Sequence, residues 1–325
     1  MTFTRRALLL AGALLFIVLI GWQGLPALFS TLSLAGAGLL LVALFHALPL
    51  VLDAAALRVF FRRGTRGAGL LDTVLTRWVG ESVNSLMPAG QLGGPFVMIR
   101  QLTQRGVAMA WAAATVTVST TFQLLGQVLF ALMGVALIGT KTSAVLLVCI
   151  AVMGTLLIGF YLMQRRGLFG TVIRLVIRYL TPGHLHSFTG HAEAFDCAVR
   201  QAYERRVRST SSFGLSLFGW VVGTGEVYLI LRLIRAPVSW KSALLLESLG
   251  QAIRGAAFAI PGSLGVQEGG YLLLAPLAGL SPEAALAMSL AKRARELLLG
   301  VPGLLYLHFF ERRVSLPAAP GRPFL

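Results

Sequence analysis

The chain has 325 residues, of which 56% are hydrophobic and 12% are charged, and its mean hydropathy is +0.79. Soluble domains carry about twice this fraction of charged residues, so the composition excludes a soluble globular protein and predicts a multi-pass membrane protein. The net charge of +16 falls mostly between the apolar stretches, which fits cytoplasmic loops and anionic lipid surfaces better than nucleic acid.

Apolar stretches of about 20 residues, long enough to cross the hydrocarbon core of a bilayer, recur along the chain. They cover residues 7–28, 33–57, 107–138, 143–163, 211–231 and 283–309. The first follows Arg5 and Arg6 and resembles a signal sequence, but it continues to Phe29 without a small-residue cleavage site. We therefore expect an uncleaved first span. The fold class predicted is an all-α polytopic membrane protein with about six full spans.

Two further segments, 69–87 and 240–260, mix apolar and charged residues, and each ends in a phrase rich in proline and glycine. The helix-breaking residues of the two phrases are Pro88, Gly90, Gly93, Gly94, Pro261, Gly262 and Gly265. Proline lacks a backbone donor and glycine disfavours a helix interior. Broken backbone at membrane depth has to be buried in protein or line a wet cavity. Each phrase therefore predicts a broken or re-entrant hairpin, although both mixed helices could instead span fully.

The two phrases belong to a longer repeat. Pro88 and Pro261 are 173 residues apart, and a similar offset persists for more than 40 residues, with Gly126 and Gly300 in register. Three predicted spans separate the phrases, an odd number, so the two repeats are expected to be inverted in the membrane.

The distribution of Lys and Arg sets the expected orientation and the domain boundaries. Arg5, Arg6, the Arg58–Arg66 cluster and the basic segment 164–209 lie inside by the positive-inside rule, which places both termini in the cytoplasm. Arg232, Arg235 and Lys241 fall on the predicted outer side and weaken this assignment. The expected parts are a first membrane repeat (1–163), a cytoplasmic connector (164–209) with an amphipathic helix over 169–179, a second repeat (210–313) and a flexible tail (314–325).

The last span carries charge near its middle, at Lys292, Arg293, Arg295 and Glu296. Each central charge costs about 2.5–3.5 kcal/mol on insertion scales, so these side chains must face protein or water. Helical spacing places Lys292, Arg295 and Glu296 on one face and Arg293 on another. The candidate partners and polar neighbours elsewhere in the chain are Arg77, Glu81, Asn84, Gln91, Glu226, Glu247, Arg254, Gln267 and Glu268.

Two interpretations of these polar residues compete. They could form a substrate-binding chamber at the membrane midplane with excess positive charge, suited to an anionic headgroup, or internal ion pairs that lock helices together. The amides of Asn84, Gln91 and Gln267 could bind phosphate or hydroxyl groups or satisfy broken backbone. His46 and Asp53, near the end of the second predicted span, could titrate or be interfacial or paired, and we expect the latter.

Motifs for ATP hydrolysis, nucleophilic catalysis and zinc binding are missing from the sequence. The loop histidines His184, His186 and His191 lack the accompanying ligands of a metal site, and Cys149 and Cys197 give no disulfide framework. We therefore expect no catalytic residue, metal or cofactor.

The residues that end and follow the mixed helices resemble a known family. They are Asn84, Pro88, Gly90, Gly93, Gly94, Arg100, Pro261, Gly262, Gly265 and Glu268. Over about residues 5–312 the chain is similar to the transmembrane region of lysylphosphatidylglycerol synthases, a flippase-like module that also occurs alone. Its length resembles the stand-alone branch associated with hopanoid biosynthesis.

The resemblance implies translocation of lipid between leaflets of the bacterial inner membrane, with the two hairpins lining the path. Family members often carry an acidic residue just after the first glycine pair, where this chain has Pro95 and Phe96, which puts ion coupling at that position in doubt. The synthases' aminoacyl-transfer domain would have to follow Arg313, where twelve residues remain, so lysyl transfer is not expected.

Three functional hypotheses follow. The first is a flippase for a polar or anionic lipid, either an anionic phospholipid or a hopanoid. The second is a membrane-embedded lipid-modifying enzyme with Glu226, Glu247 or Glu268 as acid or base. The third is a non-catalytic scaffold for lipid-synthesis enzymes. The expected partners are membrane lipids, with a homo-oligomer or lipid-synthesis enzymes as further candidates.

Overall fold

The computed structural model describes residues 36–62, 64–87, 93–138, 144–166, 185–257, 263 and 265–315, and these ranges contain helices and no strand. The helices are α3 (Gly38–Arg58), α4 (Leu70–Leu86), α5 (Gly93–Gln104), α6 (Met109–Ile138), α7 (Ala144–Arg165), α9 (Leu185–Glu204), α10 (Arg206–Leu233), α11 (Trp240–Ala256), α12 (Val266–Ala278) and α13 (Pro282–Ser315). The predicted all-α fold class is confirmed. Some predicted features lie outside the described residues. They are the first span, the amphipathic helix at 169–179, residues 316–325 of the tail, and Pro88, Gly90, Gln91, Pro261 and Gly262.

Within the described ranges, α3, α6 and α10 are long and apolar enough to cross a membrane. They correspond to the stretches predicted over 33–57, 107–138 and 211–231, although α10 begins earlier, at Arg206. Helices α7 and α13 coincide with two more of the predicted spans. The total of six full spans stays a prediction.

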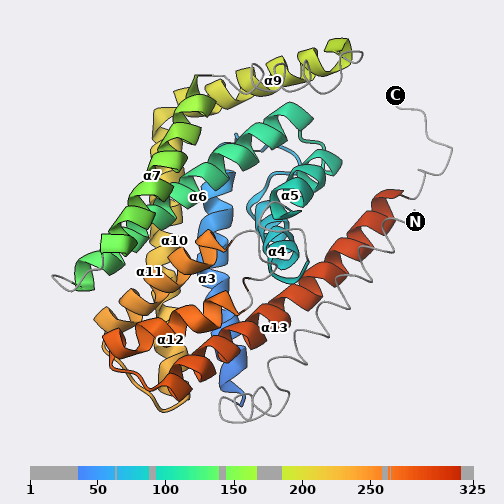
Figure 1. Cartoon of the computed structure of the whole chain (residues 1–325). Coiled ribbons are helices and arrows are strands. Elements are labelled where there is room, and N and C mark those ends of the chain that lie inside the picture. The colour runs from blue at the N-terminus through green and yellow to red at the C-terminus, as the bar shows by residue number, and fades with distance from the viewer. Residues whose placement is uncertain are drawn as a thin grey trace.

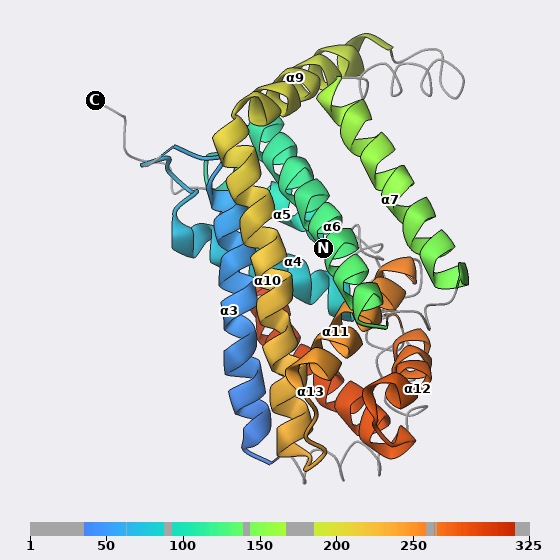
Figure 2. The ribbon, with the colours of Figure 1, turned by 90° about the vertical axis from the view of Figure 1, so that its left-hand side faces the viewer.

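Helix α9 was not predicted, because its residues were assigned only to a basic connector. It buries Ala198, Val199, Ala202 and Tyr203 against Phe60 of the loop after α3 and against Phe122 of α6. It lies across one end of the molecule (Figures 1 and 2).

The mixed helices and the short helices that follow them form two hairpins, α4 with α5 and α11 with α12. In the first hairpin the two helices pack closely, since a Cβ atom added to Gly94 would lie 2.5 Å from the carbonyl oxygen of Gly80. In the second hairpin, a Cβ atom at Gly250 would lie 2.6 Å from the ring of Tyr271. Glycine is therefore required at these contacts for the helices to pack at this distance.

Helix lengths repeat between the two halves of the chain. Helices α4, α5 and α6 have 17, 12 and 30 residues, and α11, α12 and α13 have 17, 13 and 34. The two hairpins occupy different ends of the molecule: α5 lies toward the end that carries α9, and α12 lies toward the opposite end (Figures 1 and 2).

Helices α3 and α10 run side by side through the molecule, and α13 crosses both and also packs against α4 and α12 (Figure 2). The largest apolar cluster joins α3, α6, α10, α11, α12 and α13 around Leu246, Leu249 and Met288. This packing places the charged middle of α13 at the meeting point of both hairpins.

Candidate functional site

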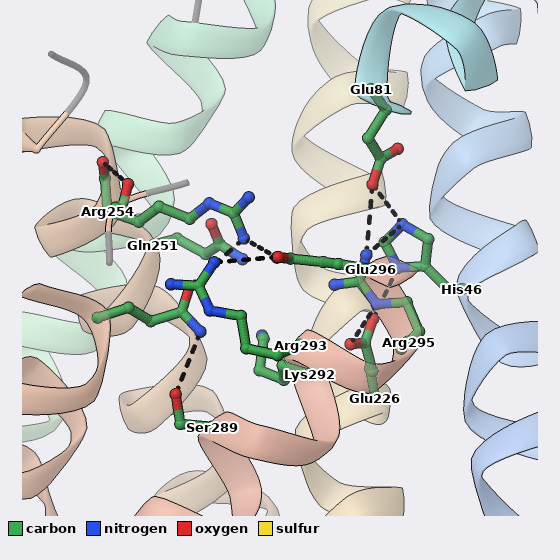
Figure 3. Close-up of polar contacts among 12 residues, drawn as sticks. His46, Glu81, Glu226, Gln251, Arg254, Ser289, Lys292, Arg293, Arg295 and Glu296 are labelled. Carbon is green, nitrogen blue, oxygen red and sulfur yellow. Dashed lines mark hydrogen bonds and ion pairs between the residues drawn. The ribbon is translucent and has the colours of Figure 1, made fainter. Parts of the chain in front are cut away.

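The charged turn of α13 lies in the interior. Lys292 is 1% exposed, Arg295 and Glu296 are each 4% exposed, and Arg293 is 9% exposed. An isolated ionised group at such depth is very unfavourable unless it is paired and hydrogen-bonded. Each of the four charges is paired, and Figure 3 shows the side chains that converge on this turn from the surrounding helices.

Lys292 links α13 to the second hairpin. Its Nζ atom donates to Oε2 of Glu247 on α11 at 2.5 Å and lies 5.9 Å from the ring centroid of Tyr271 on α12. The other oxygen of Glu247 accepts from Nε2 of Gln251 at 2.8 Å. Both carboxylate oxygens of Glu247 are therefore satisfied, and the lysine is held by a carboxylate and an aromatic face.

Arg295 links α13 to α10 and α4. Its Nε donates to Oε1 of Glu226 at 3.1 Å, and its Nη1 lies 3.4 Å from Oε1 of Glu81. His46 on α3 lies between the same two carboxylates, with Nδ1 2.7 Å from Oε2 of Glu226 and Nε2 2.8 Å from Oε1 of Glu81. Four helices thus meet in one cluster of two carboxylates, a guanidinium and an imidazole.

Glu296 faces two arginines. Arg254 of α11 pairs with its Oε1, and Nη1 of Arg293 lies 3.1 Å from its Oε2. Nε of Arg293 also donates to Oε1 of Glu268 on α12 at 3.2 Å, and Oγ of Ser289 donates to the same oxygen. Arg293 was predicted to project from another face of the helix than Lys292, Arg295 and Glu296. It nevertheless pairs with Glu296, because residues three apart are neighbours on a helix surface.

The predicted excess of positive charge is also wrong for the described residues. The acidic members of the network are Asp53, Glu81, Glu226, Glu247, Glu268 and Glu296, and the basic members are Arg77, Arg254, Lys292, Arg293 and Arg295 together with His46. Six carboxylates therefore face five Lys and Arg side chains and one histidine. The network is close to neutral when His46 carries a proton.

Other predicted residues serve neighbouring contacts. Arg77 pairs with Asp53 at 3.2 Å, and Gln123 donates to the same carboxylate at 2.7 Å. Oδ1 of Asn84 accepts from the backbone N–H of Gly94 at 2.7 Å, so this amide satisfies the start of α5 and does not join the central network.

At the second break, Gly265 has a positive φ of 73° just before α12. Nε2 of Gln267, in the first turn of α12, lies 3.3 Å from Oγ of Ser289. The described parts of both breaks are therefore tied by side-chain amides, and Gln91 falls outside the described residues.

A partly open pocket adjoins the cluster. It is lined by His46, Leu50, Trp78, Glu81, Ser82, Ser85, Arg295, Glu296, Leu299 and Gly300. Its volume is about 10 Å³, room for about one water molecule. This pocket is therefore too small for a lipid headgroup. No group of three His, Cys, Asp or Glu side chains within the described ranges is placed to hold a metal ion.

His46 and Asp53 were not singled out from the sequence as members of the buried charged network. The two residues lie seven positions apart on α3 and so share a helix face. Two ionisable residues at this spacing inside an apolar span are a signal that this face of the helix is buried against polar partners.

Comparison with known protein families identifies the family to which the chain belongs. The family model described as "Lysylphosphatidylglycerol synthase TM region" matches residues 7–303. No curated protein and no solved structure matches the chain. The match extends over most of the chain and includes both hairpins and the charged turn of α13. The chain therefore belongs to the lysylphosphatidylglycerol synthase transmembrane-region family, as a multi-pass membrane protein that handles lipid.

Proposed function

We propose that the chain moves a polar lipid between the leaflets of the bacterial inner membrane. The observation that carries the proposal is the buried network through which α13 contacts both hairpins. Arg295 reaches Glu81 of the first hairpin, and Lys292 and Glu296 reach Glu247 and Arg254 of the second. A headgroup that crosses the bilayer needs polar partners at membrane depth, and intramembrane charges between helices are typical of such paths.

The hairpin geometry supports alternating access. At about 1.5 Å per residue, α5 and α12 are about 18 and 20 Å long, shorter than the hydrocarbon core of about 30 Å. We therefore propose that both hairpins are re-entrant. Their positions at opposite ends of the molecule and the matching helix lengths support two inverted repeats, within 1–163 and 210–313, joined by a cytoplasmic connector. The distribution of Lys and Arg supports cytoplasmic termini.

The nearly neutral charge of the network indicates which lipid headgroups it could bind. A nearly neutral set of paired carboxylates and cations offers both donors and acceptors to a headgroup that temporarily replaces one partner of a pair. A polyhydroxylated hopanoid or a zwitterionic phospholipid fits this chemistry. An anionic phospholipid fits less well, because the cations of the described network already face carboxylates.

The small pocket beside the cluster suggests where the path would open. Glu81 and Trp78 of α4 and Arg295 and Leu299 of α13 line it, and Nε1 of Trp78 donates to the carbonyl oxygen of Leu299 at 2.9 Å. Separation of α4 from α13 would break these contacts and enlarge the space beside the cluster. We propose this seam as the entrance for the headgroup.

A reconstitution assay tests the function. Purified full-length protein is placed in phosphatidylcholine vesicles with NBD-labelled phosphatidylethanolamine or NBD-labelled phosphatidylglycerol, and dithionite reports the outer-leaflet fraction. Wild type is expected to move the zwitterionic probe faster than empty vesicles do. Native hopanoid lipid, competing with the labelled probe, is expected to slow it.

Matched variants separate a transport role from a structural one. Arg295→Gln is expected to abolish probe movement, whereas Arg232→Gln, which alters an exposed arginine on α10, retains it. Folding of both is checked by size-exclusion chromatography and circular dichroism. Folded wild-type protein that moves none of the probes and is not occupied by hopanoid would contradict the proposal.

We propose no acid–base catalysis by Glu226, Glu247 or Glu268. Each carboxylate is ion-paired with a lysine or arginine in the described structure, so a lipid would have to displace that cation before it could contact the paired oxygen. Mass spectrometry of lipids incubated with the protein tests this directly. Formation of a modified lipid that disappears with Glu247→Gln would favour the enzyme hypothesis instead.

A further inference from the structure

We infer that His46, Glu81 and Glu226 form a proton-binding site that couples proton movement to lipid movement. The inference rests on the proposed function for its coupling step, and on the geometry of the cluster for the site itself. The imidazole of His46 lies between the two carboxylates, at 2.7 Å from Glu226 and 2.8 Å from Glu81. These three residues come from α3, α4 and α10.

The two short contacts require two hydrogens. A carboxylate only accepts hydrogen bonds, and a neutral imidazole carries a single N–H. One of the contacts would otherwise place a nitrogen lone pair against a carboxylate oxygen. The three residues therefore hold two hydrogens in these bonds, as an imidazolium between two carboxylates or as an imidazole beside one carboxylic acid. The site is occupied by a proton that it could release.

Arg295 provides a donor to which Nε2 of His46 can bond after it has released its proton. Its Nη1 lies 3.3 Å from Nε2 of His46 and 3.4 Å from Oε1 of Glu81. While Nε2 carries a hydrogen, it donates to Glu81 and cannot accept from Arg295. Once that hydrogen leaves, Nε2 becomes an acceptor for Arg295 and loses its bond to Glu81. Protonation thus ties α3 to α4, and deprotonation ties α3 to α13.

The charges around His46 are set by every helix that packs on α3. Helix α4 contributes Glu81 and Arg77, α10 contributes Glu226, and α13 contributes Arg295. Farther along these elements, Asp53 of α3 pairs with Arg77, and Glu296 of α13 lines the same pocket as His46. Helix α6 presents the uncharged Gln123. Among the described residues, proton loss from His46 therefore leaves Glu81 with Arg295 as its direct cation.

The pocket supplies access for the proton. His46, Glu81 and Arg295 all line its partly open space, which lies at the seam between α4 and α13 proposed as the headgroup entrance. A proton that enters by this route changes the bond that ties α4 to α3. Opening of the seam has to break the contact between Arg295 of α13 and Oε1 of Glu81 on α4. The same carboxylate oxygen is the partner of Nε2 of His46, so proton binding and opening act on one carboxylate.

A vesicle experiment tests the coupling. Wild-type protein is reconstituted in phosphatidylcholine vesicles with NBD-labelled phosphatidylethanolamine outside and the pH indicator pyranine inside, with and without an imposed pH gradient. We expect probe movement to depend on the gradient and the lumen pH to change with it. His46→Gln is expected to lose both effects, since an amide cannot donate to two carboxylates on opposite sides. His308→Gln, a histidine near the end of α13, is the matched control and retains both.

A second readout examines the site without transport. Nitrogen-15 solid-state NMR of histidine-labelled protein in bilayers near neutral pH, with infrared detection of protonated carboxyl groups, is expected to show an imidazolium or a carboxylic acid. That signal should vanish in His46→Gln and persist in His308→Gln.

The outcomes separate the two proposals. Probe movement that ignores the gradient, or that keeps its gradient dependence in His46→Gln, overturns the coupling and leaves lipid movement intact. A complete lack of probe movement overturns the proposed function and the coupling with it, and the spectra then decide the site alone. A neutral His46 with no protonated carboxyl group overturns the proton site in either case.

Discussion

The pair of Lys292 and Glu247 offers the sharpest test of the buried network. Lys292 is 1% exposed and its Nζ lies 2.5 Å from Oε2 of Glu247, whose other carboxylate oxygen accepts from Gln251. Lys292→Met keeps the length of the side chain and removes its charge. Because it leaves a buried carboxylate without its cation, we expect a loss of about 3–5 kcal/mol in the free energy of unfolding.

The double variant Lys292→Met with Glu247→Leu removes both charges and fills the same space with apolar atoms. Replacement of a whole buried pair by apolar residues is often neutral or stabilising, so we expect the double variant to recover most of the loss. Unfolding by urea in detergent micelles, followed by circular dichroism, measures all variants. Lys241→Met removes an exposed lysine in the first turn of α11 and is expected to change stability by no more than about 0.5 kcal/mol.

Two outcomes of these unfolding measurements would contradict the prediction. If Lys292→Met is as stable as Lys241→Met, the buried pair does not hold α13 against α11. If the double variant is no more stable than either single variant, the loss comes from packing and not from the uncompensated charge.

Two further predictions concern the packing of α4. Gly94→Ala places a methyl group 2.5 Å from the backbone oxygen of Gly80 and is expected to cost about 1–3 kcal/mol. Gly214→Ala on α10, which meets nothing within 4 Å, is expected to be neutral or to stabilise by up to about 1 kcal/mol, and equal unfolding midpoints for the two variants would contradict the close contact. Trp78→Phe loses the donor to the carbonyl oxygen of Leu299 and is expected to cost about 1 kcal/mol and to speed hydrogen exchange in α4. Unchanged exchange there would show that this bond does not hold the seam.

Hydropathy and proline/glycine placement predicted much of the fold. Helices α3, α6, α7, α10 and α13 follow their apolar stretches, because a continuous apolar segment satisfies its own backbone hydrogen bonds only as a helix in lipid. The mixed helices α4 and α11 end near the predicted breaks, where proline and glycine disfavour a continued helix. Helix α9 was missed because an apolar face on a polar helix gives a weaker signal than a span, and its partners lie far away in the sequence.

The chemistry of the site was predicted less completely. The charges on α13 were identified as buried, since lipid exposure of several charges is too costly. The excess of positive charge was not found, because Arg77 and Arg254, which add positive charge beside the two predicted breaks, pair with Asp53 and Glu296 in the structure. Asn84 was a candidate for substrate binding or for satisfying broken backbone, and in the structure its amide oxygen accepts from the backbone N–H of Gly94.

The sequence by itself determined that this is a helical membrane protein with two helix-breaking phrases and a buried charged turn, because the cost of exposing polar groups to lipid depends on local composition. Only the tertiary structure decided which charges meet. Glu226 and Arg295 are 69 residues apart, and His46 and Glu226 are 180 apart. No local pattern specifies such partners, since ion pairing depends on distances of a few ångströms that arise only when α3, α4, α10 and α13 pack together.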